Sequence, residues 1–236
     1  SLTQGMVDGN FLTKEITALL QMILRAYITE FITEERLNSN DQNYLQTELF
    51  DKIEKRLTDA LGLAPFLKPL YEPEFLTING RRYKNIPIIL KEMRANSEFY
   101  ARLSPQYLQL TNGDFRFQNI LSDGKNFLFV DPRGDRRGDF VYDLAKLSDV
   151  VFGKFVLLEQ GFYRLGIRED GEVLIEFSLD KENRIWKICE DLENKFFGIL
   201  KDSGALEYLY KHEPSWRLRM ELVYALNFAG YVLFRV

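Results

Sequence analysis

Cysteine and histidine are nearly absent from this sequence: each occurs once among 236 residues, as Cys189 and His212. A single cysteine excludes a disulfide framework within the chain and favours a reducing compartment, so we expect a cytoplasmic location. A single histidine argues against a histidine-rich zinc site and against a Ser-His-Asp triad. The apolar pattern around Cys189 predicts a small core residue on a helix.

Long apolar runs, a signal-peptide pattern and a large excess of either charge are also missing. The most apolar helical pattern, over residues 16–32, is interrupted by Gln21, Arg25 and Glu30, so no segment is predicted to span a membrane. A net charge of -4 gives no broad electrostatic reason to bind nucleic acid or an anionic membrane. The chain starts without methionine and stops inside an apolar helical pattern, so we expect a piece of a longer protein.

Helical patterns dominate the chain, and β-hairpins interrupt them. Helices are predicted over residues 13–32 (Thr13 as N-cap), 42–61 (Gly62 as C-cap), 87–103, 139–152, 183–200 and from 215 to the end. Hairpins are predicted at 75–85, 119–130 and 162–179, with turns at Asn79-Gly80 (type I′), Ser122–Gly124 and Asp170-Gly171. Because no βαβ alternation calls for a parallel sheet, the predicted class is α+β and mostly helical.

One segment, residues 112–143, carries most of the functional information. It contains Asp114, Asn119 five residues later, a hairpin, and Asp131 at the end of that hairpin. The hairpin returns the chain to its start, so we expect the three side chains to meet. Two carboxylates and an amide oxygen, with basic side chains close by, suit a hard divalent cation that itself holds phosphate oxygens.

Phosphoryl transfer matches this set of side chains. The reaction needs a carboxylate beside the attacking hydroxyl, oxygen ligands for magnesium, and a cation facing the transferred group. Asp114 can supply the first, Asn119 and Asp131 the second, and Arg116 the third. Asp114 and Arg116 are two residues apart and would project to the same side of an extended loop.

This segment resembles the catalytic and metal loops of the aminoglycoside phosphotransferase and choline kinase family, small-molecule relatives of protein kinases. The family pattern is a catalytic aspartate, four residues, an asparagine with two apolar residues, a hairpin, a metal-binding aspartate, and a GD…DL segment that opens a helix. The matching positions here are Asp114, Asn119, Asp131 and residues 138–144.

The resemblance implies an α+β, mostly helical C-terminal lobe of a protein kinase-like fold, with inserted β-hairpins and without the N-terminal β-lobe. This single lobe would cover residues 1–236. A helical part with a hairpin would occupy 1–105, the catalytic and metal loops 106–150, and a hairpin with C-terminal helices 151–236.

The resemblance also implies residue roles. Asp114 resembles the catalytic base, and Asn119 and Asp131 resemble the magnesium ligands that hold the nucleotide. Arg116 stands where protein kinases place a lysine that touches the transferring phosphate. Asp143 resembles the family's structural aspartate at the start of a helix, where free amides and the helix dipole favour a carboxylate.

The sequence departs from the family pattern in three respects. The family's histidine is Asn112, which can orient the loop by hydrogen bonding, and the residue after the metal aspartate is Pro132. Residues 1–105 contain no pattern of an N-terminal sheet with a phosphate-anchoring lysine. An N-lobe removed from the sequence, an N-lobe in a preceding domain, and a degenerate relative all remain open.

The implied function is an ATP- or GTP-dependent phosphotransferase that uses Mg²⁺. Its partners would be the nucleotide, a small-molecule hydroxyl acceptor (a sugar, an amino alcohol or an aminoglycoside-like compound), and a missing N-lobe or preceding domain. The main alternative is a catalytically inactive kinase-like binding or scaffold domain. A metal-dependent phosphohydrolase using Asp131 and Asp135 ranks last, because such enzymes usually need histidines and clustered carboxylates.

Overall fold

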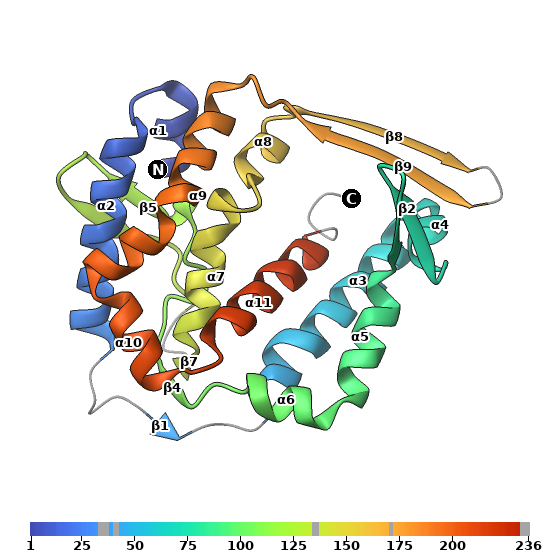
Figure 1. Cartoon of the computed structure of the whole chain (residues 1–236), viewed down its shortest axis with the longest axis horizontal. Coiled ribbons are helices and arrows are strands. Elements are labelled where there is room, and N and C mark those ends of the chain that lie inside the picture. Colours follow the sequence, from blue (N-terminus) through green and yellow to red (C-terminus); the bar gives the residue numbers. More distant parts are fainter. Residues whose placement is uncertain (33–37, 40–42, 134–136, 170–171, 232–236) are drawn as a thin grey trace. The chain divides into compact units, whose positions relative to one another are not determined.

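In the part of the chain that the structure describes, helices provide most of the secondary structure and β-hairpins interrupt them, as the sequence predicts (Figure 1). The computed structural model describes residues 1–32, 38–39, 43–133, 137–169 and 172–231. The predicted α+β, mostly helical class is therefore confirmed. Two units share these residues, and each unit is assembled from segments far apart in the sequence.

The first unit contains residues 1–41, 105–161 and 181–224. Its helices are α1 (Leu2–Asp8), α2 (Thr13–Ala26) with the π-helix Tyr27–Phe31, the 3₁₀-helix Phe117–Asn119, α7 (Phe140–Val151), α8 (Phe155–Glu159), α9 (Arg184–Ser203), α10 (Ala205–His212) and most of α11 (Trp216–Gly230). Its strands form an antiparallel sheet in the order β1 (Asn38–Ser39), β4 (Tyr107–Leu110) and β7 (Arg137–Gly138), and a hairpin of β5 (Ile120–Ser122) and β6 (Phe127–Phe129).

Helix α2 packs against α9 (Figure 1), and each of the two helices has a buried apolar stripe. The buried stripe of α2 consists of Ile16, Leu19, Leu20, Ile23 and Leu24. The facing stripe of α9 includes Cys189, which is fully buried, as expected of a core residue. Burial raises the pKa of the Cys189 thiol to about 12, so this thiol is unreactive at neutral pH.

Helix α7 is buried over its whole length. Asp139 caps its N-terminus by accepting a hydrogen bond from the Val141 amide at 2.9 Å, so the predicted helix start is confirmed. Three charged residues, Asp143, Lys146 and Asp149, recur at intervals of three on this helix and are all buried. That spacing places them along one side of the helix.

Arg219 of α11 joins three parts of the first unit. Its Nε lies 2.7 Å from Asp139 Oδ2, and its Nη2 also donates to Glu213. Glu213 in turn accepts hydrogen bonds from the backbone amides of Gln106 and Tyr107, both at 3.3 Å. All three charged side chains are almost completely buried. The network therefore ties α11 and the start of α7 to the strand that leads into residues 112–119.

The second unit contains residues 42–104, 162–180 and 225–236. Its helices are the π-helix Gln46–Asp51, α3 (Lys52–Leu63), the 3₁₀-helix Pro65–Leu67, α4 (Lys68–Tyr71), α5 (Ile86–Ala95), α6 (Ser97–Leu103) and the end of α11. Its sheet has the order β3 (Arg81–Lys84), β2 (Phe75–Ile78), β9 (Val173–Leu179) and β8 (Tyr163–Glu169). Asn79 and Gly80 both have positive φ, 49° and 75°, as a type I′ turn requires. The turn predicted at Asp170-Gly171 lies outside the described residues.

Several predicted helix ends are wrong. Thr13 is the first residue of α2 and Leu12 is its cap, because Glu15 Oε2 accepts the Leu12 amide at 3.1 Å. Gly62 lies inside α3. The helix predicted over 87–103 is two helices, because the Asn96 side chain accepts the Phe99 amide and caps a new helix.

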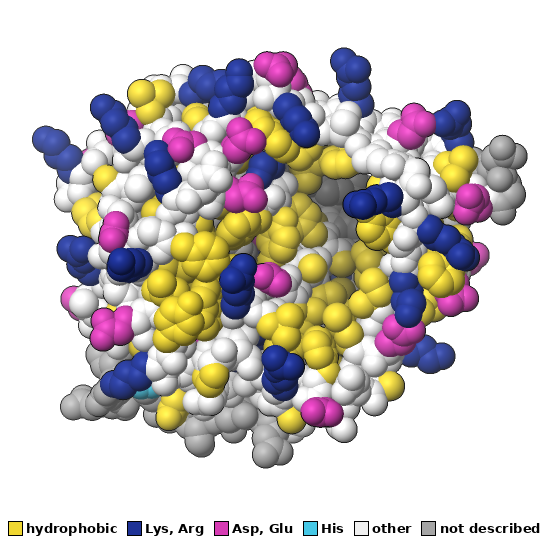
Figure 2. All heavy atoms as spheres, viewed as in Figure 1, with side chains coloured by type: hydrophobic (Ala, Val, Ile, Leu, Met, Phe, Trp, Pro, Cys, Tyr) yellow, Lys and Arg dark blue, Asp and Glu magenta, His cyan; other side chains and the backbone are white. Residues whose placement is uncertain are grey.

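The surface carries both signs of charge. On the face shown in Figure 2, Lys and Arg side chains are interspersed with Asp and Glu side chains. This distribution agrees with a chain of 31 basic and 35 acidic residues. Among the described residues, no helix combines the length and the apolar character needed to cross a membrane.

Candidate functional site

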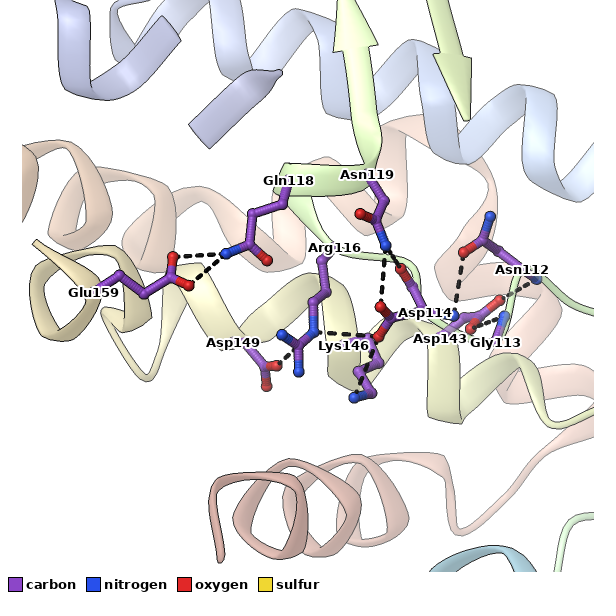
Figure 3. Close-up of polar contacts among 10 residues, drawn as sticks. All are labelled: Asn112, Gly113, Asp114, Arg116, Gln118, Asn119, Asp143, Lys146, Asp149 and Glu159. Atoms are coloured by element: carbon purple, nitrogen blue, oxygen red, sulfur yellow. Dashed lines mark hydrogen bonds and ion pairs between the residues drawn. The ribbon is translucent and has the colours of Figure 1, made fainter. Parts of the chain in front are cut away.

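Asp114 and Asn119 meet in the loop that follows β4 (Figure 3). The Asn119 Nδ2 donates to the Asp114 carboxylate at 3.0 Å and to the Asp114 carbonyl at 2.9 Å. The intervening chain turns tightly, since the Arg116 amide donates to the Asp114 carbonyl at 2.8 Å. The structure thus brings together two of the three residues predicted to share a site. Because the side-chain nitrogen of Asn119 faces Asp114, the side-chain oxygen of Asn119 is the atom that can coordinate a cation.

Asp131 is held beside the same loop by its neighbours in the chain. The Val130 amide donates to the Asn119 carbonyl, and the Arg133 amide donates to the Asn112 carbonyl, both at 2.9 Å. The predicted hairpin is therefore present, and it returns the backbone to the loop on either side of Asp131. Asp131 is exposed and has a left-handed φ of 52°. Such a conformation costs a non-glycine residue roughly 1–3 kcal/mol and is concentrated at functional sites.

Acidic, histidine and cysteine side chains alone do not form a metal centre in the described part of the chain. Among the described residues, no three side chains of the His, Cys, Asp and Glu types are grouped so that they could hold a metal ion. The predicted magnesium site depends instead on one carboxylate, Asp131, and the amide oxygen of Asn119. That donor set is chemically suited to Mg²⁺, which commonly keeps several waters and takes only one or two protein carboxylates together with substrate phosphates. Asp135, which the phosphohydrolase alternative needs, lies outside the described residues.

Basic side chains surround Asp114 on its other side. Arg116 Nε lies 3.3 Å and Lys146 Nζ lies 3.4 Å from the same oxygen, Asp114 Oδ1. Arg116 also lies 3.9 Å from Asp149. The predicted proximity of Arg116 to Asp114 is confirmed, and Arg116 remains partly accessible, with 17% of its side chain exposed. Both oxygens of Asp114 are therefore held by donors or cations of the protein (Figure 3).

Sequence reasoning missed Lys146 and Asp149. Both side chains are almost completely buried on α7, where charged groups are rarely placed without a partner. A signal was available, because FVYDLAKLSDVV places charged residues at regular intervals of three within an otherwise apolar helix. Burial lowers the pKa of Lys146 to about 8, and the positive charge of Arg116 acts in the same direction.

Asp143 holds the loop in shape. Its carboxylate accepts hydrogen bonds from the backbone amides of Asn112 at 2.7 Å and Gly113 at 2.9 Å, and from the Tyr27 hydroxyl at 2.5 Å. The expected structural role of Asp143 thus has a different basis from the predicted one: Asp143 accepts backbone amides of the loop, while Asp139 caps the helix. Asn112 is buried, and its side-chain oxygen accepts the Asp114 amide at 3.2 Å, which stabilises the loop without a histidine.

Gly113 is required by the loop conformation. Its φ of 77° lies in the left-handed region, and a Cβ at this position would approach the Arg133 side chain to 2.9 Å. A larger residue would therefore be strained in its backbone and would displace Arg133. The close approach places the Arg133 side chain against the residue that precedes Asp114.

Asp143 is expected to make stability depend on pH. Complete burial raises its pKa to about 6, although three hydrogen bonds act in the opposite direction. The folded state then binds a proton more readily than the unfolded state, so this contribution to stability is lost as pH rises through about 6. The advantage of the wild type over Asp143→Asn in the free energy of unfolding should grow by about 1 kcal/mol from pH 7 to pH 5. Urea denaturation at both pH values measures it, and an advantage that shrinks at pH 5 would show that the hydrogen bonds outweigh burial.

Known proteins do not add to this description: no protein-family model, no curated protein and no solved structure matches the chain. The fold defines a mostly helical α+β protein. The candidate site is a loop in which a carboxylate, an amide and two cations are held together. It lies next to a hairpin that ends in a second carboxylate. What this site does is inferred below from the chemistry of its own side chains.

Proposed function

We propose that this chain is a kinase-like phosphotransferase lobe that moves a phosphoryl group from ATP or GTP to a hydroxyl of a small molecule. One observation carries the proposal: the Asp114 carboxylate is held between the Asn119 amide and the cations Arg116 and Lys146. The hairpin brings the backbone on both sides of Asp131 to the same loop. A cytoplasmic location fits a reaction that consumes nucleoside triphosphates.

Each side chain has a defined task in this proposal. Asp114 orients the acceptor hydroxyl and takes its proton as the oxygen bonds to the γ-phosphorus, and the nucleoside diphosphate leaves as the bond to its bridging oxygen breaks. Arg116 offsets negative charge on the transferring group, since it is the partly accessible cation of the pair. Asn119 and Asp131 would hold Mg²⁺, which when bound neutralises charge on the donor phosphates.

The proposal is supported by the way the loop is preorganised. Asp143 and Asn112 fix the backbone on which Asp114 stands, and Asn119 and the two cations fix its side chain. Positioning of reacting groups and electrostatic preorganisation are the main contributions that a protein makes to phosphoryl transfer. A site of this kind needs no histidine or cysteine.

Removal of Asp131 is expected to weaken binding of the magnesium nucleotide. ATP with Mg²⁺ at about 100 times its dissociation constant should stabilise the wild type by about 2.7 kcal/mol, which a thermal-shift or denaturation experiment detects. Asp131→Ala should lose most of this stabilisation because one of the two proposed ligands is gone. Calorimetry that finds equal affinity in the variant would contradict the role of Asp131.

Asp123→Ala is the matched control for that experiment. Asp123 lies at the turn of the same hairpin and accepts the amides of Lys125 and Asn126, so it stabilises the turn rather than a ligand. The control should leave the nucleotide-dependent stabilisation unchanged. A loss in both variants would mean that hairpin stability, and not a cation ligand, is what Asp131 supplies.

A second candidate is a kinase-like binding or scaffold domain without transfer. The observation in its favour is that Asn112, which is buried, stands where the family pattern has a histidine. This candidate predicts nucleotide-dependent stabilisation without nucleoside diphosphate release. Measuring both quantities on the same protein separates the two candidates.

A further inference from the structure

Lys146 is an unusual charged residue in this chain because it lies in the middle of the buried helix α7. Only 2% of its side chain is exposed, compared with 17% for Arg116. Placing an ammonium group in such a position is costly unless an opposite charge compensates it. Asp114 Oδ1, at 3.4 Å from Lys146 Nζ, supplies such a charge.

The contacts of Asp114 divide between its two carboxylate oxygens. Oδ2 accepts the hydrogen bond from Asn119 at 3.0 Å, while Oδ1 faces Arg116 and Lys146 at 3.3 and 3.4 Å (Figure 3). Arg116 is shared with Asp149 and is accessible enough to turn toward a bound phosphate. Lys146 is too buried to do the same. If Arg116 leaves Asp114 for the phosphate, Lys146 is the cation that stays.

We propose that Lys146 is a positioning residue. From the buried helix α7 it holds the Asp114 carboxylate in one orientation, while Arg116 binds the transferring phosphoryl group. This role rests on the proposed phosphoryl transfer, although the ion pair itself does not. With only 2% of its side chain exposed, Lys146 is not placed to touch the nucleotide or the acceptor. In this role its effect on the reaction passes through Asp114, and it should therefore change turnover more than nucleotide affinity.

The charge of Lys146 makes the proposed role measurable as a pH dependence of turnover. Burial lowers its pKa to about 8, so the ammonium is lost at mildly alkaline pH. The groups that act on it or border it include Asp114, Arg116, Arg133, Asp149 and the ring of Tyr142, and the charge of Asp149 also acts on Tyr224 of α11. As pH rises through about 8, Asp114 loses the charge of one of the two cations beside its Oδ1, and turnover should fall.

The test compares Lys146→Met, Lys146→Arg and the wild type, with Mg²⁺ and ATP as substrates, water as the acceptor, and ADP release as the readout from pH 6 to pH 10. In the wild type, turnover should fall about tenfold per pH unit above about 8. Lys146→Arg should extend activity beyond pH 10, because a guanidinium keeps its charge. Lys146→Met should lose about 100-fold in kcat at pH 7 with little change in the KM for ATP.

Lys154→Met is the matched control. Lys154 is another buried lysine of the same unit, and it pairs with Glu193 rather than with a residue of the loop. Its replacement should keep the wild-type pH profile. A Lys146→Arg variant with the same alkaline loss as the wild type, or a wild type without that loss, would overturn the proposal.

A measurement without turnover separates this proposal from the proposed function. ¹⁵N NMR titration of the lysine ammonium groups should show Lys146 binding its proton about tenfold more weakly in Asp114→Asn than in the wild type, because the charge of Asp114 raises its pKa. An unchanged titration would overturn the ion pair. A changed titration with no ADP release by the wild type would retain the pair and reject phosphoryl transfer, and with it the role of Lys146 in turnover.

Discussion

Replacing Asp114 with asparagine is expected to lower turnover by about 10²- to 10⁴-fold, the usual contribution of a positioned general base. Asparagine has nearly the same shape but cannot take the proton of the acceptor hydroxyl. It would also present no negative charge to Arg116 and Lys146, which lie 3.3 and 3.4 Å from Asp114 Oδ1. ADP release with Mg²⁺ and ATP measures the change.

The fold should survive this substitution. The loop backbone is fixed by Asp143, which accepts the amides of Asn112 and Gly113, and these hydrogen bonds do not involve the Asp114 side chain. Circular dichroism and the nucleotide-dependent thermal shift should therefore remain close to those of the wild type. Near-full turnover in Asp114→Asn would show that Asp114 is not the base.

Replacing Arg219 with methionine is expected to destabilise the first unit by about 3–5 kcal/mol, because two buried carboxylates lose their shared counter-charge. Asp139 and Glu213 are both almost completely buried, and burial raises the pKa of each of them. The loss exceeds that of an ordinary core substitution, since the uncompensated charges cannot reach water. Urea denaturation followed by tryptophan fluorescence reports on this unit, in which both tryptophans, Trp186 and Trp216, lie.

Two further variants show whether the uncompensated buried charges cause that loss of stability. Arg217→Met removes the neighbouring arginine, whose side chain is 66% exposed and pairs with Glu221, and should change stability by no more than about 0.5 kcal/mol. Combining Arg219→Met with Asp139→Asn and Glu213→Gln should recover much of the loss, because the buried charges are removed together. A small effect of Arg219→Met alone would mean that water reaches the two carboxylates.

Local patterns predicted the fold where neighbouring residues decide it. Asn79-Gly80 formed the predicted turn because both residues tolerate positive φ. The helix predicted over 87–103 failed at Asn96, because a side chain that can cap a helix competes with continuing it. The parallel pairing of β2 with β9 joins residues about a hundred positions apart, and no local pattern encodes such a contact.

The candidate site, like the fold, was predictable only where residues close in the sequence decide its structure. The five-residue spacing of Asp114 and Asn119 and the hairpin before Asp131 are local features, and the structure has the first pair in contact. Lys146 and Asp149 reach the loop from α7 through tertiary packing. Their partners could not be identified from spacing in the sequence. Only their burial in an apolar helix indicated that partners must exist.

The most direct test of the account is a crystal structure of the protein with Mg²⁺ and a non-hydrolysable ATP analogue. The proposed function predicts a cation about 2.1 Å from the Asn119 amide oxygen and from an Asp131 carboxylate oxygen, with the terminal phosphate facing Asp114. A nucleotide bound elsewhere, or a cation that leaves Asn119 and Asp131 without contact to it, would contradict the account.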